Sequence, residues 1–230
     1  PLREAVPCLV HRGPPARGST ARRTDCCEGM GLKILGEDGP AEWLYWVGGA
    51  TALDERNQKV AQAFALLLRR AGVDFAILGE EEQCTGDPAR RIGNEYLYQM
   101  MARANVETLG RYGIKKIITT CPHCYNTFKN EYHQFGGDYE VVHHAEFLGR
   151  LVAEGRLRLK ESSLGSLAFH DSCYLARYNG IVQEPRTLLE RAGVELVEPA
   201  NGGDGLSGSA GGAGHVWSVE MGARGSNQGG

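Results

Sequence analysis

The alternation of short apolar runs with amphipathic stretches constrains the fold of this 230-residue chain most strongly. The apolar runs, which are typical of buried strands, lie at 43–47, 73–78, 114–119 and 139–142. The amphipathic stretches that predict helices lie at 54–71, from 87–88 to about 112, 122–132 and 144–154. Strands that alternate with helices of this length form βαβ units. The sequence therefore predicts an α/β fold with a mostly parallel, Rossmann-like sheet.

A second, shorter series follows a polar linker, with a strand from 167, a loop that carries Cys173, a helix at 184–192 and a strand at 194–197. We therefore expect two pseudo-repeated lobes, a first cysteine-rich lobe at 31–160 and a partial second lobe at 161–230. Residues 1–30 are rich in Pro, Gly and Arg without hydrophobic periodicity, which predicts a disordered arm. Residues 201–230 hold 11 of the 32 glycines, which predicts a Gly-rich, disordered tail.

Composition narrows the classes of protein and the compartment. The net charge of −3 gives no indication of binding to nucleic acid or to an anionic membrane surface. No apolar run approaches the roughly 18 residues of a membrane span. The odd number of seven cysteines excludes a disulfide framework in which every thiol pairs within the chain. We expect a reducing, cytoplasmic environment, where clustered cysteines are typical of metal or redox chemistry.

Four cysteines, Cys84, Cys121, Cys124 and Cys173, lie just beyond the ends of predicted strands. The carboxyl ends of parallel strands share one edge of a sheet, and ligands bind there. We therefore expect these four side chains to converge on one site. The other three, at positions 8, 26 and 27, lie in the predicted arm, and we expect no role for them.

The Cys121-Pro-His-Cys124 motif at a strand-to-helix turn has two interpretations. It is typical of a dithiol whose first thiol is activated by the helix N-terminus, and equally of a pair of metal thiolates. Its place beside other converging thiols favours metal. Four thiolates suit a [4Fe–4S] cluster and also structural zinc. With three thiolates, one iron would take water, a histidine such as His123 or another donor, and His170 could supply a nearby proton.

The spacing of these motifs repeats. Gly49 and Cys84 are separated by 34 residues, as are Gly86 and Cys121, and Cys173 and Gly208. A fixed period indicates an internal duplication, here with an unfinished second copy.

This pattern resembles the cysteine-rich (CCG) domain found in heterodisulfide reductase, the glycolate oxidase iron–sulfur protein, the lactate-utilisation iron–sulfur proteins and related oxidoreductases. That family has a duplicated Cys, Cys-Cys-Gly and Cys-x-x-Cys pattern. The segments that carry the resemblance lie at 45–48, 84–90, 93–96, 119–124, 170–173 and 210–217. The chain departs from the family at Gly49, Thr85 and Gly208-Ser209, each of which stands where the family has cysteine.

The resemblance implies an iron–sulfur electron-transfer subunit whose cluster, most simply [4Fe–4S], is held by Cys84, Cys121, Cys124 and Cys173. It implies partner subunits of the flavoprotein, ferredoxin or quinone-linked membrane type, through which the protein would be membrane-associated. The alternatives are a zinc-stabilised or metal-free α/β interaction module, and a dithiol oxidoreductase that uses Cys121 and Cys124 directly.

Overall fold

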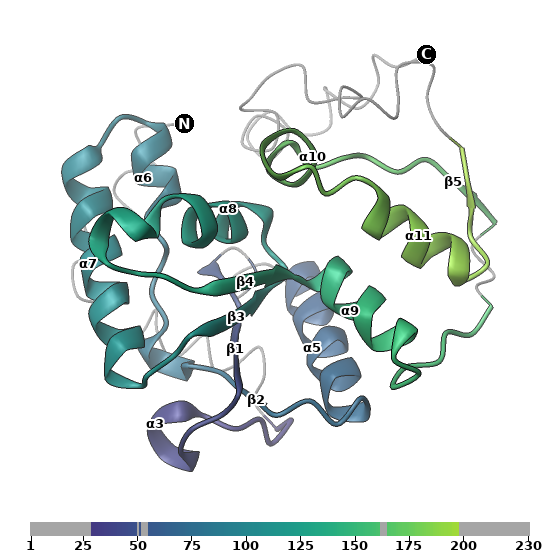
Figure 1. The fold of residues 1–230 in the computed structure, drawn as a ribbon, viewed down its shortest axis with the longest axis horizontal. Coiled ribbons are helices and arrows are strands. Elements are labelled where there is room, and N and C mark those ends of the chain that lie inside the picture. The colour runs from purple at the N-terminus through teal and green to yellow at the C-terminus, as the bar shows by residue number, and fades with distance from the viewer. Residues whose placement is uncertain (1–28, 50, 52–54, 162–164, 198–230) are drawn as a thin grey trace. The chain divides into compact units, whose positions relative to one another are not determined.

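The computed structural model describes residues 29–49, 51, 55–161 and 165–197, and Figure 1 shows its fold. The described residues fall into two compact units, one ending at Arg158 and the other beginning at Leu159. Within the described ranges, none of the helices combines the length and the apolar character that crossing a membrane requires.

The first unit is built on a four-stranded sheet in which every neighbouring pair is parallel, as the sequence predicts. Its strands, in the spatial order β2-β1-β3-β4, are β2 (Phe75–Ala76), β1 (Trp43–Trp46), β3 (Lys116–Thr119) and β4 (Glu140–His143). β1 is buried at all four positions, which explains why its sequence is continuously apolar rather than alternating. β2 is shorter than predicted and is extended by an isolated parallel bridge between Ile34 and Ile77.

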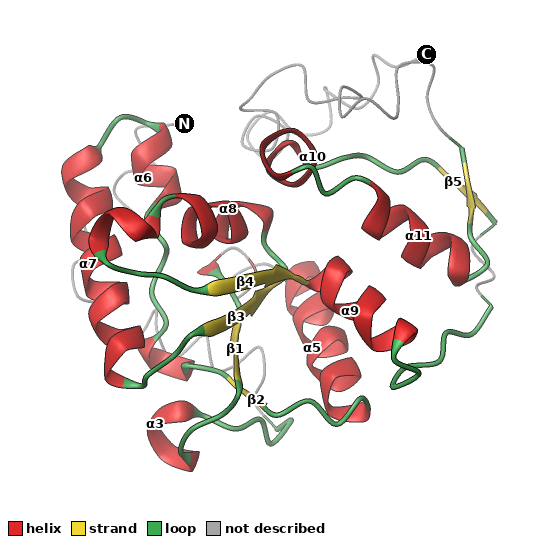
Figure 2. Ribbon diagram, in the orientation of Figure 1, coloured by secondary structure: helices red, strands yellow, loops and turns green. Residues whose placement is uncertain are grey.

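Helices cover both faces of this sheet (Figure 2). On one side lie α5 (Glu55–Arg70) and α9 (His144–Ala153), and on the other lie α6 (Asp87–Arg91), α7 (Glu95–Arg111) and α8 (Pro122–Asn130). Two short 3-10 turns, η1 (Gly79–Glu81) and η2 (Tyr132–Phe135), and the helix α3 (Leu35–Asp38) complete the unit.

The core has two layers because neighbouring residues of a strand point to opposite faces. Tyr45 of β1 packs edge-on against Phe64 of α5, with ring centroids 5.1 Å apart. Trp46, the next residue, packs against Phe128 of α8 at 4.7 Å. Both β1 side chains are fully buried, so this strand anchors α5 and α8 to the same sheet.

One predicted helix is two. The expected helix from Asp87 to about Tyr112 is broken between α6 and α7, because Gly93 has a φ of 82°. The Asn94 side chain then accepts a hydrogen bond from the Leu97 amide and caps α7. The predicted cap of the first helix also shifts by one residue, since the N-cap is Gly86 and Asp87 is already helical.

The second unit holds β5 (Ser166–Leu167) and β6 (Glu195–Leu196), which pair in parallel, with α10 (Cys173–Asn179) and α11 (Gln183–Arg191) between them. Cys173, predicted in a loop, is the first residue of α10. The internal duplication of the two lobes stays a prediction. The predicted N-terminal arm, its three cysteines, the Gly-rich tail and the Gly208-Ser209 pair lie outside the described residues.

Candidate functional site

Three of the four predicted ligands meet at the carboxyl edge of the sheet. Cys121 follows β3 as the N-cap of α8, and its Sγ accepts a hydrogen bond from the backbone amide of Cys124 at 3.5 Å. Cys84 lies in the loop between η1 and α6, and its charge acts on the thiol of Cys124. Cys124 is buried, and Cys84 and Cys121 are half-buried. The fold thus brings together Cys84 and Cys121, which are separated by 36 residues in the sequence.

The two thiols of the C-x-x-C motif differ strongly. The hydrogen bond from the Cys124 thiol lowers the pKa of Cys121 to about 6, against the effect of burial, with help from the backbone amide of Cys124 and the charge of His123. The same hydrogen bond, burial, and the negative charges of Cys121, Cys84 and Glu82 hold the pKa of Cys124 well above its ordinary value. Cys121 is therefore a thiolate at neutral pH, which is the form that binds metals and attacks disulfides.

Thr85 occupies the position of the second cysteine in the family's Cys-Cys-Gly motif. Its Oγ1 lies 3.9 Å from the Sγ of Cys124, and its side chain is buried. The hydroxyl therefore adds a polar contact to the sulfur of Cys124 at a place where the family pattern has another thiol.

The end of β1 borders the same site. Gly48 has a φ of 86°, and a Cβ at this position would lie 3.7 Å from the Sγ of Cys124 and 3.8 Å from the Cβ of Cys121. Gly48 thus brings bare backbone beside the cysteines. The buried Glu82 carboxylate holds this turn, because Oε2 accepts from the Val47 amide at 2.9 Å and Oε1 from the Gly48 amide at 2.7 Å.

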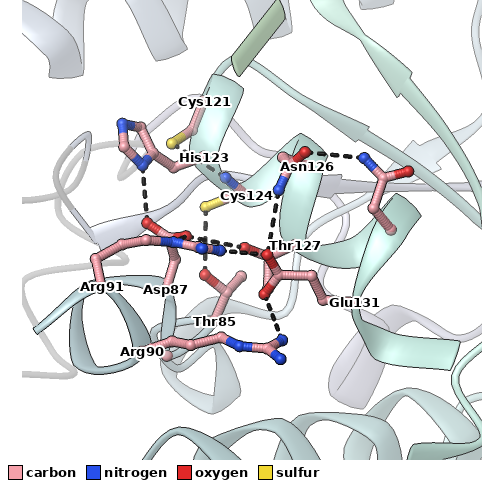
Figure 3. A network of polar contacts seen from close by, with 12 residues as sticks. Thr85, Asp87, Arg90, Arg91, Cys121, His123, Cys124, Asn126, Thr127 and Glu131 are labelled. Carbon is pink, nitrogen blue, oxygen red and sulfur yellow. Dashed lines mark hydrogen bonds and ion pairs between the residues drawn. The ribbon is translucent and has the colours of Figure 1, made fainter. Parts of the chain in front are cut away.

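A polar network ties α6 to the helix that carries the C-x-x-C motif (Figure 3). Asp87 accepts hydrogen bonds from Nδ1 of His123 at 2.8 Å, from Nε of Arg91 at 2.8 Å and from the Thr127 hydroxyl at 3.4 Å. Burial raises the pKa of Asp87, but His123 and Arg91 outweigh it, so the pKa is lowered overall. Burial likewise lowers the pKa of His123, but Asp87 and the Cys121 thiolate outweigh it and the pKa is raised.

Glu131, at the other end of α8, completes the network. It accepts from Nη1 of Arg90 at 2.9 Å and also forms a short hydrogen bond with Nη2 of Arg91. The Asn126 amide donates to it at 3.3 Å. Two arginines of α6 are therefore held against the carboxyl end of α8.

A buried hydrogen-bond chain fixes the backbone of the Cys84 loop. The Asn105 side chain, from α7, donates to the Cys84 carbonyl at 2.9 Å and to the Tyr132 hydroxyl at 3.0 Å. The Tyr132 hydroxyl in turn donates to the Thr85 carbonyl at 2.9 Å. These bonds satisfy carbonyl groups that would otherwise be costly to bury.

Cys173, the fourth predicted ligand, belongs to the second unit, where it is half-buried at the first turn of α10. Two residues before it, the buried Asp171 accepts two hydrogen bonds from the Arg186 guanidinium, at 2.7 and 2.6 Å. His170 is exposed. In the described parts of the chain, no three His, Cys, Asp or Glu side chains are grouped tightly enough to hold a single metal ion.

Sequence reasoning missed Glu82, Asn105 and Glu131. Each is a polar residue in a segment whose pattern predicts only a loop or an amphipathic helix. Their hydrogen bonds join residues 21 to 41 positions apart, and no local signal predicts such pairs. The low exposure of Glu82, at 3%, is visible only in the folded chain.

Comparison with known proteins identifies relatives of the chain. Residues 43–129 match the model of the family described as "Cysteine-rich domain". The chain is 48% identical over 168 residues to the EtfAB:quinone oxidoreductase of Syntrophomonas wolfei, covering 73% of this chain and 24% of that protein. It is 47% identical to the probable iron-sulfur-binding oxidoreductase FadF of Bacillus subtilis, covering 78% of this chain and 26% of that protein.

A third relative is one of the proteins that form the dihydromethanophenazine:CoB–CoM heterodisulfide reductase of Methanosarcina mazei, 33% identical over 69% of this chain and 40% of that protein. The chain thus spans between about a quarter and two fifths of the length of these three relatives. No solved structure matches it. From the family match over residues 43–129 and these relatives, which include iron–sulfur oxidoreductases and a heterodisulfide reductase, the chain belongs to the cysteine-rich domain family that its motifs predict.

Proposed function

We propose that this chain is the cysteine-rich part of a heterodisulfide-reductase-like oxidoreductase and carries electrons through an iron–sulfur cluster. In this proposal Cys84, Cys121, Cys124 and Cys173 hold a cluster of the [4Fe–4S] type. The observation that carries the proposal is the meeting of Cys84, Cys121 and Cys124 at the carboxyl edge of one parallel sheet. Thiolates are the ligands that iron–sulfur clusters take in proteins.

The surroundings of the three cysteines fit such a group. Cys121 is a thiolate at neutral pH, so it needs no strong base to become a ligand. Gly48 presents backbone without a side chain beside Cys124, at a distance that a Cβ would occupy. When bound, the cluster supplies a carrier that accepts and gives up single electrons.

The remaining polar residues of the site orient the ligands and balance their charge. Asp87 holds His123 and Arg91 beside the C-x-x-C motif, so positive charge lies close to the thiolates. The Thr85 hydroxyl contacts the sulfur of Cys124, and the Asn105–Tyr132 pair fixes the carbonyl groups of the Cys84 loop. Hydrogen bonds and positive charge near the sulfurs favour the more negative, reduced state of a cluster, so these contacts tune its potential.

The relatives suggest the kind of assembly. One is named an EtfAB:quinone oxidoreductase, another forms part of a heterodisulfide reductase, and a third, from Chromohalobacter salexigens, is a probable membrane-anchored ferredoxin. We extend these descriptions to the chain as a proposal. It would exchange electrons with a flavoprotein, a ferredoxin-type or a quinone-linked membrane subunit, on the cytoplasmic side of the membrane.

Anaerobic purification of the full chain tests the proposal. We expect iron and acid-labile sulfide in equal amounts, a brown colour and an EPR signal after reduction. The changes Cys84→Ser, Cys121→Ser and Cys124→Ser should each lower the iron content severalfold, while Cys8→Ser, in the predicted arm, should not. A colourless protein with one zinc ion per chain would contradict the proposal and favour the zinc-stabilised module.

Cys173 needs its own test because it lies in the second unit. If it is the fourth ligand, Cys173→Ser should lower the iron content or give a cluster with the EPR signal of one altered iron. Unchanged iron content and an unchanged signal would mean that the two units do not share the cluster.

A dithiol oxidoreductase is the second candidate, because the pKa of Cys121 near 6 is also that of an activated attacking thiol. In that case the iron-free chain should reduce a small disulfide at pH 7. Both Cys121→Ser and Cys124→Ser should abolish this reaction, and Cys84→Ser should leave it intact. Loss of the reaction with Cys84→Ser, or no reaction in the wild type, would exclude this candidate.

A further inference from the structure

Glu82 is a buried carboxylate that no motif of the family pattern accounts for. Its exposed fraction is 3%, and both of its oxygens accept backbone N–H bonds, from Val47 at 2.9 Å and from Gly48 at 2.7 Å. Two N–H donors stabilise the ionised form of a buried carboxyl group. The residue therefore places a fixed negative charge at the carboxyl end of β1.

This charge lies beside the cysteine site. Gly48, which donates one of the two hydrogen bonds, is the residue whose Cβ would lie 3.7 Å from the Cys124 sulfur. The negative charge of Glu82 reaches the Cys124 thiol. Charges interact more strongly in such water-poor surroundings than in solvent, because the local dielectric constant is lower.

On the basis of the proposed function, we infer that Glu82 is a positioning residue that holds the Val47–Gly48 turn against Cys124 and lowers the reduction potential of the cluster bound there. Reduction adds one electron to the cluster, taken from the partner subunit, and the product is one charge more negative. A fixed carboxylate nearby raises the free energy of that more negative product. Glu82 thus makes the reduced cluster a stronger donor.

The chain offers a matched control one residue away. Glu81 belongs to the same short segment, but its side chain is exposed and accepts hydrogen bonds from the Tyr112 hydroxyl at 2.8 Å and from Arg111 at 3.4 Å. Glu81→Gln therefore removes the same charge from the sequence at a place where solvent screens it.

The experiment is an anaerobic redox titration of the full chain, followed by EPR, for the wild type, Glu82→Gln, Glu82→Asp and Glu81→Gln, with iron and sulfide measured in each. At the wild-type midpoint, the ratio of reduced to oxidised cluster should rise about tenfold in Glu82→Gln, which corresponds to about 59 mV for one electron. Glu82→Asp keeps the charge and should change the ratio less than threefold. Glu81→Gln should leave it unchanged. Iron content should be equal in all four proteins.

Three results would overturn the inference alone. These are a wild-type midpoint in Glu82→Gln with full iron, an equal shift in Glu81→Gln or Glu82→Asp, and a Glu82→Gln chain that fails to fold or loses iron, which would make Glu82 purely structural or a ligand. A wild-type chain without iron would overturn the proposed function and the inference with it, so the two failures are distinguishable.

Discussion

At the scale of single residues, Gly86 shows how tightly the cysteine loop is built. It has a φ of 85°, a conformation that L side chains rarely adopt, and it caps α6. A Cβ here would lie 3.0 Å from Cδ2 of Tyr98 and 3.3 Å from the Tyr98 carbonyl oxygen. The glycine of Cys84-Thr-Gly86 is therefore required by the backbone and by its neighbour.

Gly86→Ala should lower the free energy of unfolding by about 2–4 kcal/mol, from the left-handed conformation and from overpacking against Tyr98. Gly113→Ala is the matched control, since Gly113 also has a positive φ, of 64°, but no atom lies within 4 Å of a Cβ there. It should cost about 1–2 kcal/mol, the conformational part alone. Urea unfolding of the iron-free chain measures both, and equal losses would contradict the clash with Tyr98.

Two adjacent histidines lie at the junction of β4 and α9. Nδ1 of His143 accepts from the Ala145 amide at 3.4 Å, so its Nε2 carries the proton and donates to the Thr120 carbonyl at 3.2 Å. Nδ1 of His144 lies 3.1 Å from that same Nε2. Burial, and the charge of His144, lower the pKa of His143 well below its ordinary value, and burial lowers the pKa of His144 to about 4.

Both histidines are thus neutral in the folded chain, while in the unfolded chain they bind protons below about pH 6.5. The unfolded state therefore binds more protons, and stability should fall as the pH drops from about 6.5 towards 4, by up to about 1.4 kcal/mol per pH unit for each histidine. His144→Asn should make this slope shallower. His133→Asn, at an exposed position, should keep the wild-type slope. Equal slopes in all three proteins would contradict the assignment.

At the scale of elements, the contact between α6 and α8 decides where the C-x-x-C motif lies relative to Cys84. Glu131, with a side chain 12% exposed, receives two arginines of α6. Arg90 also lies 3.6 Å from the more exposed Glu95. One carboxylate is therefore shielded from solvent and the other is not, although both pair with Arg90.

Glu131→Gln should destabilise the chain by about 1–2 kcal/mol, because it removes charge-assisted hydrogen bonds from partly buried arginines. Glu95→Gln should change stability by less than about 0.5 kcal/mol, as expected for an exposed pair. Thermal unfolding of the two variants in parallel measures the difference. Equal effects would mean that the clamp between α6 and α8 contributes no more than a surface ion pair.

Much of this level could be predicted from the sequence. Continuous apolar runs predicted the strands, and the parallel order then predicted that Cys84 and Cys121 would share one edge. The break between α6 and α7 was missed because the helical pattern continues through Gly93, and only the positive φ at that glycine ends α6. Asp87 fits a cap by sequence, but its pairing with His123 depends on a contact between residues 36 apart.

At the scale of the whole chain, the two units have separate polar interiors. In the second unit, Arg186 and Asp171 have side chains only 7% and 2% exposed and form a two-pronged ion pair. This pair joins α11 to the segment just before Cys173. Removing one partner of a buried pair leaves the other charge uncompensated, which is strongly destabilising.

Asp171→Asn should therefore open the second unit locally, at a cost of about 3–5 kcal/mol to the stability of that unit. Hydrogen exchange followed by mass spectrometry should show faster exchange in 165–197 and unchanged protection in β1 and β3. Glu184→Gln, an exposed position on α11, is the control and should change neither region. Loss of protection in β1 would contradict independent polar interiors.

The placement of the candidate ligands in loops and at the starts of helices, away from the large core side chains, has a consequence for how such a protein can change over generations. Tyr45 and Trp46 hold the sheet to its helices through apolar contacts, so substitutions at the edge of the sheet leave the scaffold intact. Gly49 and Thr85 stand where the family pattern has cysteine, yet β1 and α6 form beside them. A fold of this kind can exchange one donor atom for another, or abandon its cofactor, and still be inherited as a stable part.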